Sequence, residues 1–323
     1  MGIILINLLL SVIGLFGLYF GGEKLVAGSV TIASTLKLRP QLIAITIIAL
    51  GTSLPELVVS VNAVLKGSPD IAFGNVVGSN ISNLLCVLGL AAIAAPLCIQ
   101  RGTLKMDVFW LLLASGIFAS LAQFLSSISV WGGGLLILLL VFVITHLAYA
   151  SLKTHNGQIS SKSSYDVEIK GKLLYGLMTV FFGALILLGS AELVVFSAKK
   201  IAAFLLVPEV FIGLTIIALG TSLPEIAASV VAVKKGYSDI AIGNVIGSNI
   251  FNSLGIIGAS AIASGSNKFV APENFLKFDI MTMLCITIII SGILLYVRKV
   301  GRYLGVIFLC TYLIYILISF QQI

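Results

Sequence analysis

Charged residues are scarce in this sequence. Of its 323 residues only 10% are Asp, Glu, Lys or Arg, whereas 59% are apolar; soluble globular proteins have about 25% charged residues. Such a chain cannot cover its surface with polar side chains, which excludes a soluble fold and indicates a membrane protein surrounded by the lipid bilayer. The formal net charge of +7 does not indicate a nucleic-acid partner, because Lys and Arg concentrate in the cytoplasmic loops of membrane proteins.

Histidine and cysteine are scarce as well. The two histidines and four cysteines show no CxxC spacing, which disfavours zinc or copper, since these metals prefer nitrogen and sulfur ligands. An intramembrane hydrolase built on paired acids would need an activated water and a path for a peptide, and the sequence identifies neither. We therefore expect no enzyme, no permanently bound cofactor and no protein partner.

Long apolar runs are abundant, and each is long enough to cross a hydrocarbon core of about 30 Å as a helix. We expect an all-α membrane protein with ten transmembrane helices. The expected spans are 3–33, 41–65, 70–97, 106–125, 128–151, 172–198, 209–233, 239–265, 277–297 and 303–320. If the N-terminus is outside, most Lys and Arg residues fall in inside loops, so we expect a multi-pass protein of the plasma membrane with both termini outside.

The most informative feature is an internal repeat. The segment TIIALGTSLPE occurs at 46–56 and again, unchanged, at 215–225, which is 169 residues later. The same offset relates DIAFGNVVGSNISN at 70–83 to DIAIGNVIGSNIFN at 239–252, and Glu23 to Glu192. A register that is kept across three separate blocks indicates an internal duplication.

The duplication predicts two halves of opposite orientation. We expect a first five-helix repeat at 1–152, a short cytoplasmic linker at 153–171 and a second repeat at 172–323. Because five is an odd number of crossings, the second repeat enters the membrane from the opposite side. Inverted repeats with a site at their interface are typical of transporters, and the long first and sixth spans are candidates for the moving element.

Each GTSLPE block is expected to break its helix inside the membrane. Pro55 and Pro224 remove a backbone donor, and Gly51 and Gly220 loosen the preceding turn. Irregular backbone at this depth must be buried in protein or line a cavity. The side-chain oxygens at the two breaks belong to Thr52, Ser53, Glu56, Thr221, Ser222 and Glu225. On the next span of each half, Ser79 and Asn83 share one helix face, as do Ser248 and Asn252.

The two glutamates need a positive partner. A charged group at the bilayer centre costs at least about 3 kcal/mol and is normally paired, yet the spans that carry Glu56 and Glu225 and the spans after them contain no internal Lys, Arg or His. Three partners remain: a proton, a basic residue of a distant span, or an imported cation. Carboxylates among hydroxyl, amide and carbonyl oxygens suit Ca²⁺ and can also hold Na⁺. Elsewhere, Glu23 could contact the ion path or pair with Lys24.

At these residues the sequence resembles the sodium/calcium exchanger family, whose paired alpha repeats are similar to GTSLPE and GNVVGSN or GNVIGSN. The resemblance implies that the two glutamates are the central cation ligands. It implies a ligand set of Ala49, Thr52, Ser53, Glu56, Ser79, Asn83, Ala218, Thr221, Ser222, Glu225 and Ser248, and it places Asn252 where some members carry an aspartate. Two formal negative charges, rather than three, leave the number of Na⁺ ions per Ca²⁺ open.

The resemblance and the residues together predict a secondary active antiporter that transports small inorganic cations and exchanges Ca²⁺ for Na⁺ by alternating access. A proton-coupled calcium antiporter is the nearest alternative, because a carboxylate pair can also trade Ca²⁺ for protons. A passive cation channel belongs to another class, and it would need a continuous wet path with several weak sites. The clustering of oxygen ligands at one depth favours the antiporter.

Overall fold

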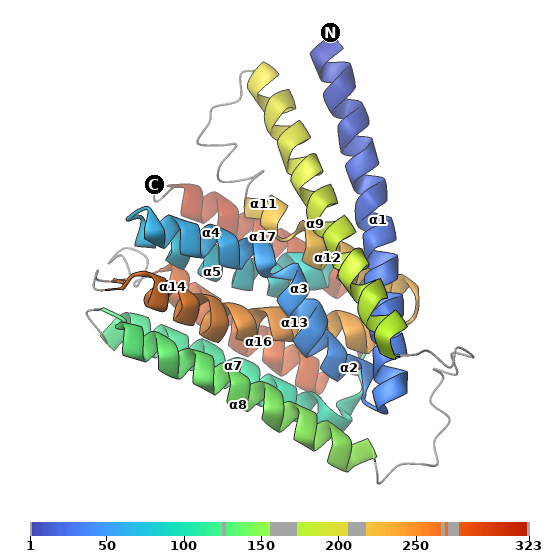
Figure 1. The fold of residues 1–323 in the computed structure, drawn as a ribbon, viewed down its shortest axis with the longest axis vertical. Coiled ribbons are helices and arrows are strands. Elements are labelled where there is room, and N and C mark those ends of the chain that lie inside the picture. Colours follow the sequence, from blue (N-terminus) through green and yellow to red (C-terminus); the bar gives the residue numbers. More distant parts are fainter. Residues whose placement is uncertain are drawn as a thin grey trace.

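The computed structural model describes residues 2–124, 127–155, 173–205, 218–265, 269–270 and 278–321, and these are nearly all helical (Figure 1). The first half contains α1 (Gly2–Leu36), α2 (Pro40–Ile43), the π-helical segment η1 (Ala44–Ile48), α3 (Ala49–Thr52), α4 (Leu54–Leu65), α5 (Pro69–Ser82), η2 (Asn83–Val87), α6 (Leu88–Ala94), α7 (Arg101–Phe124) and α8 (Val130–His155). The second half contains α9 (Leu173–Phe204), α11 (Ala218–Thr221), α12 (Leu223–Lys234), α13 (Ser238–Ile250), η4 (Phe251–Ile256), α14 (Ile257–Ala263), α16 (Asp279–Tyr296) and α17 (Arg302–Gln321).

Within these residues, eight helices are long and apolar enough to cross a membrane, and the bent pair Pro40–Thr52 and Leu54–Leu65 adds a ninth if it is one span. Their order and positions agree with the expected spans. The expected span 209–233 begins outside the described residues, so the count of ten spans in two repeats stays a prediction. α9 continues to Phe204, past the predicted end at residue 198.

Two short strands depart from the all-α prediction. β1 (Leu97–Cys98) follows α6, β2 (Lys299–Val300) precedes α17, and the two pair antiparallel. A ladder this short, between two connections that are far apart in the sequence, has no alternating pattern by which it could be predicted. It joins the connection between α6 and α7 to that between α16 and α17.

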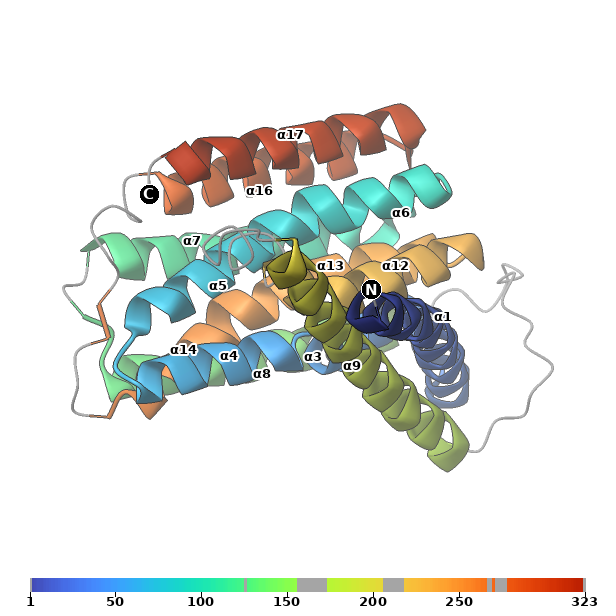
Figure 2. The ribbon, with the colours of Figure 1, turned by 90° about the horizontal axis from the view of Figure 1, so that it is seen from above.

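α1 and α9 form a layer of their own. They lie side by side and cross the other helices at a steep angle (Figure 1), and from above α9 runs obliquely across the remaining, roughly parallel helices with α1 beside it (Figure 2). Their backbones approach closely, because a Cβ atom at Gly183 would lie 2.6 Å from the Leu25 nitrogen, and one at Gly21 would lie 2.8 Å from the Leu187 nitrogen. Small residues allow this kind of contact between membrane helices.

The two GNxxGSN helices occupy the centre of the protein. The most apolar stretch of Ser238–Ala263 is 100% buried and that of Pro69–Ala94 is 83% buried, whereas that of α1 is only 22% buried. Gly243 lets the broken span of the first half approach α13, since a Cβ atom there would lie 2.8 Å from the Gln41 carbonyl oxygen. The most polar motifs of the chain are thereby enclosed by protein rather than by lipid.

Candidate functional site

Both repeated blocks break their helices at the predicted place. α3 ends before Ser53, α4 begins after it, and the two helices are bent by 46°. In the second half α11 ends before Ser222 and α12 begins after it. The repeated proline falls within the first two residues of each new helix, where a missing N–H leaves no helical hydrogen bond unmade. Glu56 and Glu225 therefore lie in a first turn, where the helix dipole favours negative charge.

The two glutamates are completely buried, with 0% exposure. The Ser53 hydroxyl donates to Glu225 Oε1 at 2.9 Å, and the Ser79 hydroxyl donates to Glu56 Oε1 at 3.4 Å. The Thr221 side chain is also hydrogen-bonded to Glu56. Each carboxylate thus interacts with a hydroxyl group of the other half, so the two breaks form one site rather than two.

Two asparagines brace the broken helices. Asn75 Nδ2 donates to the Glu56 carbonyl oxygen at 3.0 Å and to Ser60 Oγ at 2.9 Å. The equivalent Asn244 donates to Ser229 Oγ at 3.1 Å. These bonds tie the GNxxGSN helix of each half to the helix that follows the break.

Thr52 lies at the same junction and is almost fully buried. Its hydroxyl lies 3.4 Å from Asn244 Oδ1, an oxygen of the other half, and 3.4 Å from the Ala49 carbonyl oxygen. Ala49 O also accepts the Ser53 N–H at 3.0 Å, and Ala218, its equivalent, is the first residue of α11. A ligand role for these two carbonyl groups stays a prediction.

The equivalent residues Asn83 and Asn252 are held differently. Asn252 Nδ2 donates to Ser79 Oγ at 3.2 Å and to Asn80 Oδ1 at 3.1 Å, and Asn80 Nδ2 in turn donates to Ser253 Oγ at 3.0 Å. Both amide atoms of Asn83 are buried without a hydrogen-bond partner in the described structure. Ser79 and Asn80 therefore hold the amide nitrogen of Asn252 toward the first half. Asn80 was not among the predicted site residues.

Many predicted ligands carry a buried oxygen that no other described group satisfies. An unsatisfied buried polar atom costs about 1–3 kcal/mol, so each of these oxygens favours a bound partner. These atoms are Glu56 Oε2, Glu225 Oε2, Asn83 Oδ1, Ser222 Oγ, Ser248 Oγ and Asn252 Oδ1. Carboxylate, hydroxyl and amide oxygens are the donor set that Ca²⁺ and Na⁺ accept, so these residues fit an inorganic cation as cargo.

The π-helical segments were not predicted, although they occur at the site. η2 begins at Asn83, η4 includes Asn252, and η1 ends immediately before α3. A π segment adds a residue to a helical turn and often marks a functional position. Proline and glycine announce the breaks in the sequence, but no residue type announces these wider turns. The π segments at Asn83 and Asn252 recur at equivalent positions of the two repeats, and this recurrence is visible only in the structure.

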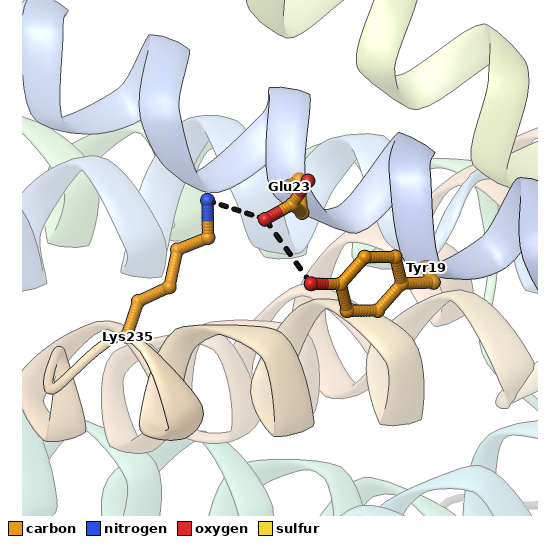
Figure 3. A network of polar contacts seen from close by, with 3 residues as sticks. All are labelled: Tyr19, Glu23 and Lys235. Atoms are coloured by element: carbon orange, nitrogen blue, oxygen red, sulfur yellow. Dashed lines mark hydrogen bonds and ion pairs between the residues drawn. The ribbon is translucent and has the colours of Figure 1, made fainter.

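Neither buried glutamate is paired with a base. In the part of the chain that the structure describes, the ion pair found is between Lys235 Nζ and Glu23 Oε1 at 2.7 Å (Figure 3), and no Lys, Arg or His pairs with Glu56 or Glu225. Among the described residues, no group of three or more His, Cys, Asp or Glu side chains is placed to hold a metal ion. Glu23 was expected either to contact the ion path or to pair with Lys24. It forms an ion pair, but the partner is Lys235 rather than Lys24.

Sequence comparison finds relatives along the whole chain. The family model described as sodium/calcium exchanger protein matches residues 6–149 and 175–321. The putative antiporter CaxA of Alkalimonas amylolytica is 33% identical over 312 residues, which cover 96% of this chain and 97% of that protein. The sodium/calcium exchanger MaX1 of Methanosarcina acetivorans is 28% identical over 350 residues, covering 98% of this chain and 99% of the relative.

Structural comparison gives a similar result. Among solved structures, the sodium-calcium exchanger NCX_Mj soaked with 2.5 mM Na⁺ and 0.1 mM Ca²⁺ matches with a TM-score of 0.80 and 30% sequence identity. The match covers 96% of this chain and 97% of that one. The same protein soaked with 10 mM Na⁺ and no Ca²⁺ also matches with a TM-score of 0.80.

Proposed function

The chain belongs to the sodium/calcium exchanger family, and we propose from this premise that it is a secondary active antiporter exchanging Ca²⁺ for Na⁺ across the plasma membrane. One observation supports this above the others. Glu56 and Glu225 are fully buried, have no basic partner among the described residues, and each keeps an oxygen without a hydrogen bond. Of the relatives that cover nearly the whole chain, one is named a putative antiporter and another a sodium/calcium exchanger, which supports the proposal.

The proposed site lies between the two helix breaks and combines ligands of both halves. Its central members are the two carboxylates. Around them stand the oxygens of Ala49, Thr52, Ser53, Ser79, Asn83, Ala218, Thr221, Ser222, Ser248 and Asn252. One Ca²⁺ or several Na⁺ would occupy overlapping positions, since hydroxyl and amide oxygens can coordinate either ion.

Charge compensation supplies the coupling. Two ionised carboxylates in a low-dielectric interior repel each other and lose their hydration, whereas a bound cation offsets both effects. A loaded site can therefore pass through the occluded state between the two openings, and an empty site is held back. With ten spans as inverted repeats and both termini outside, this motion would open the site to each side in turn.

Flux into sealed vesicles tests the proposal. An outward Na⁺ gradient should drive Ca²⁺ uptake by the wild-type protein, and Glu56→Gln or Glu225→Gln should reduce this uptake to the level of protein-free vesicles. Asp70→Asn serves as a control, because it removes an exposed acid from the first turn of α5. Uptake that persists in both site variants would reject the site.

The coupling ion is tested in the same vesicles. Separate Na⁺, K⁺ and proton gradients are imposed, and Ca²⁺ uptake should follow the Na⁺ gradient alone. Uptake driven by the pH gradient without Na⁺ would replace the Na⁺-coupled function with proton coupling. Single-channel currents far above the turnover of an antiporter would instead indicate a channel.

A further inference from the structure

An ion pair connects the long helix α1 to the end of α12. Lys235 caps the C-terminus of α12, and its Nζ atom lies 2.7 Å from Glu23 Oε1. The Tyr19 hydroxyl, one turn earlier on α1, donates to the same oxygen at 3.3 Å (Figure 3). The lysine and glutamate side chains are 36% and 28% exposed, so this contact lies at the edge of the protein, away from the fully buried glutamates of the cation site.

The ion pair lies where α1 and α12 are in close contact. A Cβ atom at Gly22, the residue before Glu23, would lie 3.2 Å from the Ala227 carbonyl oxygen and 3.2 Å from Val231 Cγ2. α1 and α12 also share one of the larger helix–helix interfaces of the protein. The seam between the α1–α9 layer and the second GTSLPE helix is therefore closed on this side.

The repeat register identifies an equivalent pair of residues on the other half. The offset of the repeats relates Glu23 on α1 to Glu192 on α9, and Lys66 at the end of α4 to Lys235 at the end of α12. In the structure, Glu192 and Lys66 are both exposed and do not pair with each other. Nor do α9 and α4 share an interface comparable to that of α1 and α12. One seam is thus closed, and its counterpart is not.

We propose that Glu23–Lys235 and Glu192–Lys66 are two latches that form in alternation during transport. Two inverted halves of nearly equivalent sequence can exchange their conformations, and the exchange yields the same molecule open to the opposite side. The contacts of α1 with α12 would then become contacts of α9 with α4. This inference rests on the proposed alternating-access function, and adds a charged contact that stabilises each end state.

The two latches are not of equal strength. Tyr19 adds a hydrogen bond to the first latch, whereas the equivalent position of the second half is Leu188, which has no donor. The state with Glu23 and Lys235 in contact is therefore favoured when no ion gradient acts. If the loop charges are oriented as expected, Lys235 is inside, and this favoured state is open to the outside.

Chemical cross-linking tests the alternation without relying on transport. In a background with the native cysteines replaced, Glu23→Cys is combined with Lys235→Cys, and Glu192→Cys with Lys66→Cys. A short bifunctional thiol reagent is used, because a glutamate–lysine pair spans more backbone distance than a disulfide tolerates. Reconstituted protein is compared in Na⁺, in Ca²⁺ and in choline. The yields of the two pairs should change in opposite directions; yields that rise together, or no yield at 192 and 66, would overturn the proposal.

Sided transport supplies the second test. Lys235→Gln should weaken the apparent Ca²⁺ affinity on the Lys66 side about two- to fivefold, as expected for a partly exposed ion pair, and Lys66→Gln should do so on the opposite side. The double reversal Glu23→Lys with Lys235→Glu re-forms an ion pair, so it should restore the apparent Ca²⁺ affinity on the Lys66 side to the wild-type value. Lys234→Gln is the matched control, removing an adjacent charge from the same helix end. Equal effects of Lys234→Gln and Lys235→Gln would contradict the latch, whereas a wild type that transports no Ca²⁺ contradicts the proposed function and leaves the cross-linking test in force.

Discussion

At the scale of single residues, Ser53 has a position that its sequence context does not reveal. It ends the break in the first half, yet its hydroxyl donates to a carboxylate of the second half at 2.9 Å. Hydrogen bonds to charged groups contribute about 1.5–3 kcal/mol. Ser53→Ala should therefore raise the Ca²⁺ Kd about tenfold to a hundredfold, as measured by isothermal titration of the purified protein.

The control for this change is Ser60→Ala. Ser60 is equally buried and accepts a hydrogen bond from Asn75, but no bond connects it to a carboxylate side chain. Its replacement should leave the Ca²⁺ Kd within about threefold of the wild-type value, because it removes none of the oxygens proposed to coordinate the cation. Similar losses in the two variants would mean that Ser53 acts through helix packing rather than through Glu225.

Asn83 and Asn252 give a second prediction, because the same substitution should have different effects at equivalent positions. Aspartate cannot donate, so Asn252→Asp loses the bonds to Ser79 and Asn80, whereas Asn83→Asp loses none within the described structure. Both variants add the same charge. Asn252→Asp should lower the free energy of unfolding by about 1–3 kcal/mol more than Asn83→Asp, as measured by thermal unfolding without Ca²⁺. Equal losses would show that the added charge, and not the lost hydrogen bonds, determines the change in stability.

The residues of the candidate site and the breaks that bury them could be predicted from the sequence, but their hydrogen-bond partners could not. A carboxylate and a proline repeated in an apolar run indicate a break with buried oxygens. The bond from Asn252 to Asn80 depends on how two distant helices meet, which no spacing encodes. Lys24 seemed a suitable partner for Glu23, but adjacent residues of a helix point in different directions, and the lysine that reaches Glu23 lies on another helix.

At the scale of helices, the sequence predicted positions better than shapes. Long apolar runs and their flanking polar residues fix where a span begins and ends to within a few residues. The π-helical segments at Asn83 and Asn252 were missed because their extra residue is accommodated by packing between central helices. The ribbon of β1 and β2 was missed for a different reason, because strands of two residues carry no periodicity.

The interface of α1 and α9 gives the prediction at this scale. A Cβ atom at Gly183 would lie 2.6 Å from the backbone nitrogen of Leu25, so Gly183→Ala must push the two helices apart. Overpacking of this kind costs about 1–3 kcal/mol, and thermal unfolding in detergent should show a lower Tm.

Gly189→Ala on the same helix is the matched control. A Cβ atom at Gly189 would meet nothing within 4 Å, and alanine favours a helix over glycine by about 1 kcal/mol. This variant should be as stable as the wild type or slightly more stable. A loss of stability at Gly189 equal to that at Gly183 would show that the close approach of α1 and α9 is not what makes the glycine necessary.

At the scale of the whole molecule, the proposed mechanism depends on how many times the chain crosses the membrane between two hairpins. Lys66 lies between α4 and α5, and Lys235 lies between α12 and α13. If residues 209–233 form a span, five crossings separate these hairpins, and they lie on opposite sides. If those residues do not cross, four crossings separate them, and they lie on the same side. Inversion of the halves, and hence the exchange of conformations between them, requires the first arrangement.

Labelling from one side distinguishes the two arrangements. Lys66→Cys and Lys234→Cys are each introduced into a chain whose exposed cysteines, Cys98, Cys285 and Cys310, are replaced by serine. A membrane-impermeant maleimide applied to intact cells should modify the cysteine at 66, whereas the cysteine at 234 should react only after permeabilisation. Modification of both from outside would place the hairpins on one side and remove the inverted repeat. Modification at 234 alone would keep the inversion and reverse the orientation, so that both termini lie inside and the proposed Glu23–Lys235 latch closes the outer side.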